Sequence, residues 1–237
     1  MSEFHKLPRV YADQPFQEGH SVALPEHIHH YLRNVMRMER EQCLRLFNGR
    51  DGEFIGTLST LDKKNAIIRL DQKIKDQPQA GRYIHLLFVP IRKERMDWLV
   101  EKAVELGVTH LHPVLSQNAD LRKINEERMQ AQIIEAAEQC ERLDIPRLEP
   151  LEDLSKVLSS WGGKPQIYAA LERYDAARLS EKHPKGDCAV LIGPSGGFSH
   201  DEMERIASKE FVTPVSLGDH ILRSETAAIA ALSLLTI

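Results

Sequence analysis

Two glycine-bearing segments in the last third of the chain carry the strongest chemical signal. In residues 189–202 an apolar stretch typical of a strand runs into Gly193-Pro-Ser-Gly-Gly-Phe198, and Ser199 and Glu202 then have the spacing of a helix capping box. Glycines let a backbone approach a ligand closely, so this segment is a candidate cofactor site, although a plain turn between strand and helix explains it as well. The segment does not match a phosphate-binding loop, because no Gly-Lys-Ser or Gly-Lys-Thr follows the glycines. The spacing of its glycines also differs from the dinucleotide-binding fingerprint.

The second segment, residues 215–231, has the same order of strand, turn and helix. Ser224 is the predicted N-cap of its helix, and Glu225 favours the helix amino end. In open α/β sheets, ligands bind outside the carboxyl ends of the strands. We therefore expect one pocket shared by the loops 193–198 and 217–223.

Residues 77–237 show the alternation of strands and helices that must position these loops. The expected strands cover residues 85–89, 110–114, 166–171, 188–192 and 212–217, and the expected helices include 94–106 and 125–143. Such alternation predicts an α/β fold with a mostly parallel sheet. In helix 125–143 the spacing predicts a polar stripe of Glu135, Gln139 and Arg142 and an apolar side of Met129, Ile133, Ala136 and Cys140.

The N-terminal part has a different pattern. Residues 43–70 read as short strands separated by turns, and residues 71–82 show no apolar periodicity. We place the linker near residue 77 and predict two domains, a small β domain over residues 1–76 and a larger α/β domain over residues 77–237.

Composition restricts the class of protein. The net charge of −4 lacks the overall basic signature of a nonspecific nucleic-acid binder, so any RNA must be met locally. No apolar stretch approaches the roughly 20 residues of a membrane span. The three cysteines are too dispersed for a disulfide framework or a zinc site, and we expect a cytoplasmic protein without a metal.

Five motifs together resemble one known family. They are Gly193-Pro-Ser-Gly-Gly-Phe198, Leu217-Gly-Asp-His-Ile-Leu-Arg-Ser-Glu-Thr-Ala227, Glu101-Lys-Ala-Val-Glu-Leu-Gly-Val108, Glu135-Ala-Ala-Glu-Gln-Cys-Glu-Arg142 and Val35-Met-Arg-Met38. In these motifs, and over nearly its whole length, the chain resembles the SPOUT class of S-adenosylmethionine-dependent RNA methyltransferases. It is most similar to the bacterial family that methylates N3 of a uridine in small-subunit (16S) ribosomal RNA.

The resemblance implies a fold and a cofactor. The C-terminal domain would be a trefoil-knotted SPOUT methyltransferase domain that forms a homodimer, and the N-terminal domain a PUA-like, RNA-binding β-barrel. S-adenosyl-L-methionine would be the cofactor and ribosomal RNA the partner. The residues that the resemblance assigns to the cofactor are Leu171, Gly193, Gly196, Gly197, Leu217, Gly218, Ile221 and Leu222.

The same resemblance suggests which side chains meet the RNA. Methylation at uracil N3 needs loss of a proton and stabilisation of the resulting negative charge. Arg223 is the candidate for this catalytic role, unless it forms an ion pair with Glu225 or caps a helix. Arg9, Arg37 and Arg142 match family positions that suit RNA contacts, unless they are ordinary surface arginines.

Two departures from the family keep alternatives open. Ser195 stands where the family usually has glutamate, and the sequence ends at Ile237, within an apolar helical stretch. A second hypothesis is therefore a non-catalytic RNA-binding or ribosome-assembly factor that retains the fold. A third keeps methyl transfer but changes the RNA, since a fold does not fix a substrate.

Overall fold

The structure, a computed structural model, describes residues 3–79, 81–162, 165–182 and 184–236. Ala80 of the predicted linker and Ile237 lie outside the described residues. Contacts divide the chain into two compact units, the first formed by Met1–Gly81 and Ala137–Ile145 and the second by Arg82–Ala136 and Pro146–Ile237. Each unit has its own hydrophobic core. Residues 137–145, which we assigned to the larger domain, pack with the smaller unit.

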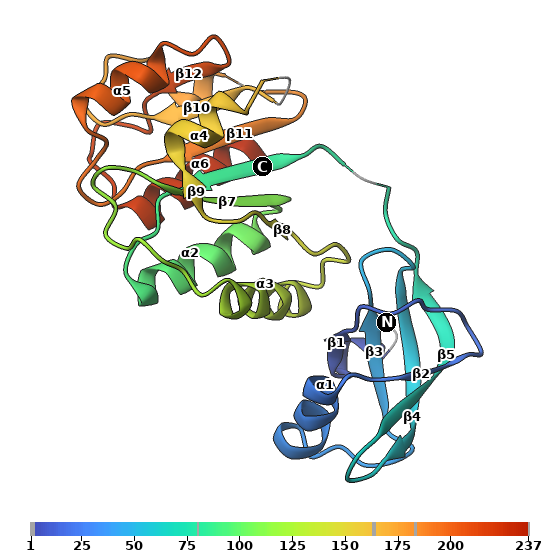
Figure 1. Ribbon diagram of the computed structural model, residues 1–237. Helices are drawn as coiled ribbons and strands as arrows, with labels where there is room; N and C mark the ends of the chain where they lie inside the picture. Colours follow the sequence, from blue (N-terminus) through green and yellow to red (C-terminus); the bar gives the residue numbers. More distant parts are fainter. Residues whose placement is uncertain (1–2, 80, 163–164, 183, 237) are drawn as a thin grey trace. The chain divides into compact units, whose positions relative to one another are not determined.

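The first unit is built on a mixed five-stranded sheet with the order β1-β3-β4-β5-β2 (Figure 1). The strands are β1 (Arg9–Tyr11), β2 (Ser21–Ala23), β3 (Cys43–Phe47), β4 (Glu53–Leu61) and β5 (Ala66–Lys75). β1 runs parallel to β3, and the other pairs are antiparallel. β5 continues through the first residues of the polar stretch to Lys75, which pairs with Glu53 of β4, so this stretch begins within a strand.

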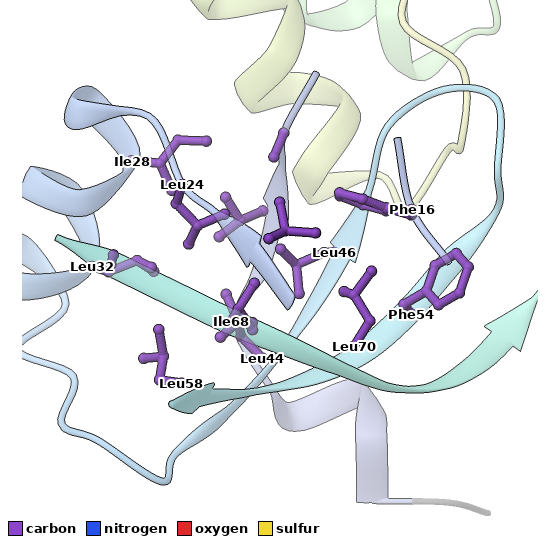
Figure 2. Close-up of a cluster of buried hydrophobic side chains, with 14 of the residues drawn as sticks. Phe16, Leu24, Ile28, Leu32, Leu44, Leu46, Phe54, Leu58, Ile68 and Leu70 are labelled. Atoms are coloured by element: carbon purple, nitrogen blue, oxygen red, sulfur yellow. The ribbon is translucent and has the colours of Figure 1, made fainter. Parts of the chain in front are cut away.

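One face of this sheet forms the core of the first unit. Alternate residues of a strand point to opposite faces, and Figure 2 shows Leu44 and Leu46 of β3 in the same cluster as Ile68 and Leu70 of β5. Helix α1 (Glu26–His30), which continues as a π-helical turn over Tyr31–Val35, contributes Ile28 and Leu32 to the cluster. The helix and the loop before it therefore close this face of the sheet.

The opposite face of β1 and β3 holds a buried ion pair. The Nε of Arg9 donates to the Glu53 carboxylate at 2.7 Å, and the two side chains are 3% and 4% exposed. The guanidinium of Arg9 lies 3.7 Å from the centroid of the Phe47 ring. Arg45, the neighbour of Arg9 across the strands, lies 3.6 Å from the same carboxylate and also pairs with Glu141.

Arg9 also determines how helix α3 ends. Its guanidinium donates to the carbonyl oxygens of Ala137 at 2.8 Å, Glu138 at 3.3 Å and Arg142 at 2.8 Å. The last carbonyls of a helix have no partner within the helix, and a cation there is favourable. α3 (Glu126–Gln139) therefore stops four residues before the predicted end at 143, and Glu141 adopts a left-handed φ of 60°. The predicted stripe is wrong at this end, because Cys140 is exposed and Arg142 lies beyond the helix.

The second unit is an α/β structure with a parallel sheet in the order β12-β10-β11-β6-β7-β8, as the alternation of elements predicts (Figure 1). The strands are β6 (Ile84–Phe88), β7 (His110–Leu115), β8 (Arg147–Leu148), β9 (Glu152–Asp153, paired with β7), β10 (Ile167–Ala170), β11 (Cys188–Ile192) and β12 (Val212–Val215). The helices besides α3 are α2 (Lys93–Glu105), α4 (Leu154–Ser159), the 3-10 turn η3 (Leu179–Glu181), α5 (His200–Ala207) and α6 (Ser224–Thr236). Ser224, the predicted N-cap of the last helix, is its first residue.

Helices α2 and α6 pack against each other, and α6 also contacts β11. The predicted apolar side of α2 is confirmed, since Met96, Leu99, Val100, Ala103 and Val104 are buried. α2 ends before Gly107, whose φ of +84° favours glycine. α6 has one charged side chain, Glu225, in its first turn and is apolar on most sides.

We expect Glu53→Gln to destabilise the first unit. Removing one partner of a buried ion pair leaves an uncompensated charge, so the free energy of unfolding should fall by about 3 kcal/mol. Hydrogen exchange of the β3 amides in the full chain, followed against urea, measures this for the first unit alone. Asp13→Asn, which breaks the exposed Arg50–Asp13 pair, is the control and should change this free energy by less than about 1 kcal/mol. Equal effects of the two variants would contradict a structural role for the buried pair.

Candidate functional site

Three loops leave the sheet of the second unit at one edge. β10 lies between β11 and β12, and Ala170 at its end is level with Ile192 and Val215. Since all three strands are parallel, the loops 171–174, 193–198 and 216–223 start side by side. The predicted arrangement, in which the second and third loops share one pocket, is incomplete because the loop after β10 lies between them.

The three loops line two neighbouring cavities. One has a volume of about 330 Å³ and contains Leu171, Leu217, Gly218, Ile221 and Leu222. The other has a volume of about 410 Å³ and contains Gly196 and Gly197. Glu172, Arg173 and Tyr174 of the middle loop line both. The structure thus places these predicted cofactor residues around one loop, whereas Gly193 lines neither cavity.

Two glycines of loop 193–198 are favoured, Gly193 by close packing and Gly197 by backbone geometry. A Cβ at Gly193 would lie 3.0 Å from the ring of Phe198, which is tighter than ordinary contact. Gly197 has a φ of +71°, and a Cβ there would lie 3.5 Å from the Glu172 carboxylate. The backbone of this loop therefore reaches the middle loop directly.

A capping box holds the end of the same loop, as the sequence predicts. The Ser199 hydroxyl accepts from the amide of Glu202, and Oε2 of Glu202 accepts from the amide of Ser199 at 3.0 Å. The other carboxylate oxygen accepts from the backbone amide of Gln117 at 2.8 Å. Glu202 is buried, so the start of α5 is fixed to the segment after β7.

Sequence reasoning missed that segment, residues 117–120. The side-chain amide of Asn118 donates to the Gly197 carbonyl at 3.1 Å, and Ser195 donates to the Asp120 carboxylate at 3.0 Å. A carboxylate from another loop thus lies at the position where this chain has Ser195 in place of glutamate. The available signal was the polar run after β7, because that strand ends at the same edge of the sheet.

Arg223 follows directly after Leu222, which lines the first cavity. The predicted alternative of an ion pair with Glu225 is wrong, because Glu225 pairs with Arg95 of α2 at 3.6 Å. In the part of the chain that the structure describes, the exposed Arg223 side chain has no hydrogen bond or ion pair. Its backbone carbonyl accepts from the amide of Ala227 at the start of α6.

The three arginines predicted to contact RNA have different environments in the first unit. The prediction for Arg9 is wrong, because its buried guanidinium is fully engaged by Glu53, Phe47 and three carbonyl oxygens. Arg142 is paired with Asp144, and its side chain is 11% exposed, so it too is mostly covered. Arg37 is exposed and has a left-handed φ of 55°.

Burial raises the pKa of the Cys188 thiol in β11, so this cysteine is not an activated nucleophile. Among the described residues, no group of three or more histidine, cysteine, aspartate or glutamate side chains is placed to hold a metal ion. No described helix is both long and apolar enough to cross a membrane.

The chain matches two family models. One is described as an RNA methyltransferase domain and matches residues 78–236, and the other is described as an RNA methyltransferase PUA domain and matches residues 24–71. The chain is also 33% identical over 232 residues to the ribosomal RNA small subunit methyltransferase E of Rickettsia conorii, with 96% of this chain and 94% of that protein covered.

Two solved structures resemble nearly the whole chain. A putative methyltransferase from Legionella pneumophila in complex with the cofactor SAM has a TM-score of 0.86 at 28% identity, covering 97% of this chain and 96% of that one. A ribosomal RNA small subunit methyltransferase E from Neisseria gonorrhoeae bound to S-adenosyl methionine has a TM-score of 0.83 at 30% identity, covering 96% of this chain and 95% of that one.

We expect Glu202→Ala to loosen the link between α5 and the segment after β7. A buried amide that loses its acceptor is destabilised by about 1–3 kcal/mol, so hydrogen exchange at Gln117 and Ser199 should accelerate by about tenfold or more. Glu204→Ala on the same helix is the control, since Glu204 is exposed and, among the described residues, its side chain forms an ion pair with His200 alone. Unchanged exchange at Gln117 in Glu202→Ala would contradict the described hydrogen bonds.

Proposed function

Because the chain belongs to the RNA methyltransferase family, we propose that it transfers a methyl group from S-adenosyl-L-methionine to N3 of a uridine in small-subunit (16S) ribosomal RNA. The observation that carries the proposal is the pair of cavities formed by the loops after β10, β11 and β12 in a chain that resembles two SAM-bound structures along nearly its whole length.

The residues around these cavities fit the cofactor. Leu217, Ile221 and Leu222 offer apolar cover for an adenine ring, and the backbone of Gly218 can come close to a ligand because no side chain intervenes. Glu172, which lines both cavities, offers a carboxylate to a positively charged group. We assign Gly196 and Gly197 to the cofactor in the second cavity. We propose that Gly193 acts indirectly, by letting the Phe198 ring pack closely against the loop backbone.

When bound, the cofactor supplies an electrophilic methyl group. The protein must hold the uracil so that N3 faces this methyl in line, and it must favour the form of the base that has lost the N3 proton. Arg223 lies beside the first cavity without a carboxylate partner among the described residues, and we propose that its guanidinium stabilises the negative charge on the uracil oxygens.

The first unit is proposed to bind the RNA. Its mixed sheet and its match to a PUA domain model support a PUA-like β-barrel, with residues 1–76 as the RNA-binding domain and residues 77–237 as the knotted methyltransferase domain. Arg37 is exposed there and remains a candidate contact for rRNA phosphates. We propose that the reaction takes place in the cytoplasm, where this RNA would be met.

The second unit is proposed to form the homodimer through α2 and α6. Trp98 of α2 is 43% exposed and Leu234 of α6 is 46% exposed, on two helices that pack together. A helix that is apolar on most sides is typically buried, and α6 is covered on only part of its surface within this chain. A second copy would cover these side chains.

Mass spectrometry of ribosomal RNA tests the reaction. RNA from a strain that lacks the gene should carry no N3-methyluridine at the target, and adding back the wild-type protein should restore it. Arg223→Ala should lower kcat about 100-fold with little change in SAM affinity, because it removes one group that stabilises developing charge. Arg147→Ala, at an exposed arginine paired with Glu149, is the control and should behave as wild type.

The outcomes separate two claims. An intact N3-methyluridine signal without the gene would contradict the proposed reaction. Full activity of Arg223→Ala would remove only the role proposed for that side chain. SAM affinity measured on the purified wild-type protein distinguishes an enzyme from an RNA-binding assembly factor, which would bind RNA but little cofactor.

The dimer is tested by Leu234→Asp. An unpaired carboxylate buried in an interface is unfavourable by more than 1.4 kcal/mol, so the dimer dissociation constant should rise about tenfold or more. Sedimentation equilibrium of the full chain measures this constant. Asn34→Asp adds the same charge at an exposed position of the first unit and should leave it unchanged. If both variants dimerise as the wild type does, α6 is not the interface.

A further inference from the structure

A third cavity lies in the second unit, and none of the residues assigned to the cofactor line it. It has a volume of about 330 Å³ and is lined by the end of β7 and the residues after it, by α4 and by α5. Leu154, Leu158 and Ile206 are buried side chains in its lining, and four serines (Ser116, Ser155, Ser159 and Ser208) also line it. We call this cavity the α4–α5 groove.

Three cations line the groove. Arg122 donates to the backbone carbonyl of Gln117 at 3.2 Å, and Arg205 donates to the carbonyl of Asp201 at 3.1 Å. Arg205 lies in the last turn of α5, and Lys209 follows two residues after the helix ends. Among the described residues, no carboxylate forms an ion pair with Arg122, Arg205 or Lys209, so their charges are available to an anion.

Two carboxylates also line the groove. Both oxygens of Glu202 accept backbone amides, so this carboxylate is already compensated by donors. Asp153 is exposed at the start of α4. The balance of formal charge in the lining is positive, with three cations against two carboxylates.

An unpaired hydroxyl points to a ligand independently of these charges. Ser116 is 4% exposed, and its buried Oγ has no hydrogen-bond partner among the described residues. A buried polar group without a partner is unfavourable by about 1–3 kcal/mol, so it suggests a site that a polar ligand completes. Ser116 belongs to the lining of the same groove as the three cations.

We propose that the α4–α5 groove binds a single-stranded segment of the RNA substrate. Phosphates would meet Arg122, Arg205 and Lys209, and a base or ribose would lie over the apolar side chains beside Ser116. The groove adjoins the loop 193–198 through Glu202, so a strand held there leads to the candidate methyl-transfer site. This inference rests on the proposed RNA substrate.

The salt dependence of RNA binding tests the groove. The probe is a fluorescein-labelled oligouridylate of eight nucleotides, titrated with the full chain at several KCl concentrations. For single strands, the slope of log K against log salt changes by about 0.7 per phosphate contact, so replacing Arg122, Arg205 and Lys209 by glutamine should reduce the slope by about 2. The matched control replaces Lys102, Arg128 and Arg147 by glutamine, which removes the same charge at cations paired with carboxylates.

A smaller slope for the groove variant, with the control close to wild type, supports the proposal. The proposal is overturned if the wild-type protein does not bind the probe at 50 mM KCl, or if the groove variant keeps the wild-type slope. It is also overturned if the slope falls by the same amount in both triple variants. Displacement of the probe by an equal concentration of free uridine 5′-monophosphate would also overturn it, because the site would then bind a free nucleotide rather than a strand.

SAM affinity measured on the same preparations separates this inference from the proposed function. A protein that binds SAM and methylates RNA, while the groove variant keeps the wild-type slope, rejects the groove alone. A protein that shows the slope change but binds no SAM rejects methyl transfer and leaves the groove as an RNA site.

Discussion

The second unit depends on one constraint, the level ending of three parallel strands with β10 in the middle. Parallel strands deliver their following loops to one edge, so segments that are far apart in the sequence start side by side. The loop after β10 therefore lines the cavities on both of its sides. Its Glu172 lies next to Gly197 of the loop after β11 and lines the same cavity as Leu217 of the loop after β12. The loop after β11 turns at Gly197 with a φ of +71°, a conformation that favours glycine.

Local patterns in the sequence were sufficient for the elements and insufficient for their order across the sheet. The strand 188–192, the buried side of α2 and the Ser199–Glu202 capping box depend on residues within one or two turns of each other, and each was confirmed. The position of β10 between β11 and β12 depends on pairing between distant strands, so the two-cavity arrangement was not predictable. The segment 117–120 was missed for the same reason, because its partners Glu202, Gly197 and Ser195 lie about 75–85 residues away.

Two arginines show that resemblance to a family does not determine the environment of a side chain. Arg9 and Arg223 both match family positions, yet the structure gives them opposite environments. Arg9 is buried against Glu53 and Phe47 and caps the end of α3, so its charge is used inside the protein. Arg223 is exposed beside a cavity, and the carboxylate two residues away pairs with Arg95 instead. Only the set of neighbouring acceptors, which the linear sequence does not contain, separates a structural arginine from a candidate for chemistry.

Hydrogen exchange of the full chain with and without S-adenosyl-L-methionine can establish whether the three loops form one cofactor site. We expect simultaneous protection of residues 171–174, 193–198 and 216–223, because a ligand held by all of them orders three separate segments at once. Protection of one loop alone, or no protection at saturating cofactor, would mean that the edge formed by β10, β11 and β12 does not hold the methyl donor.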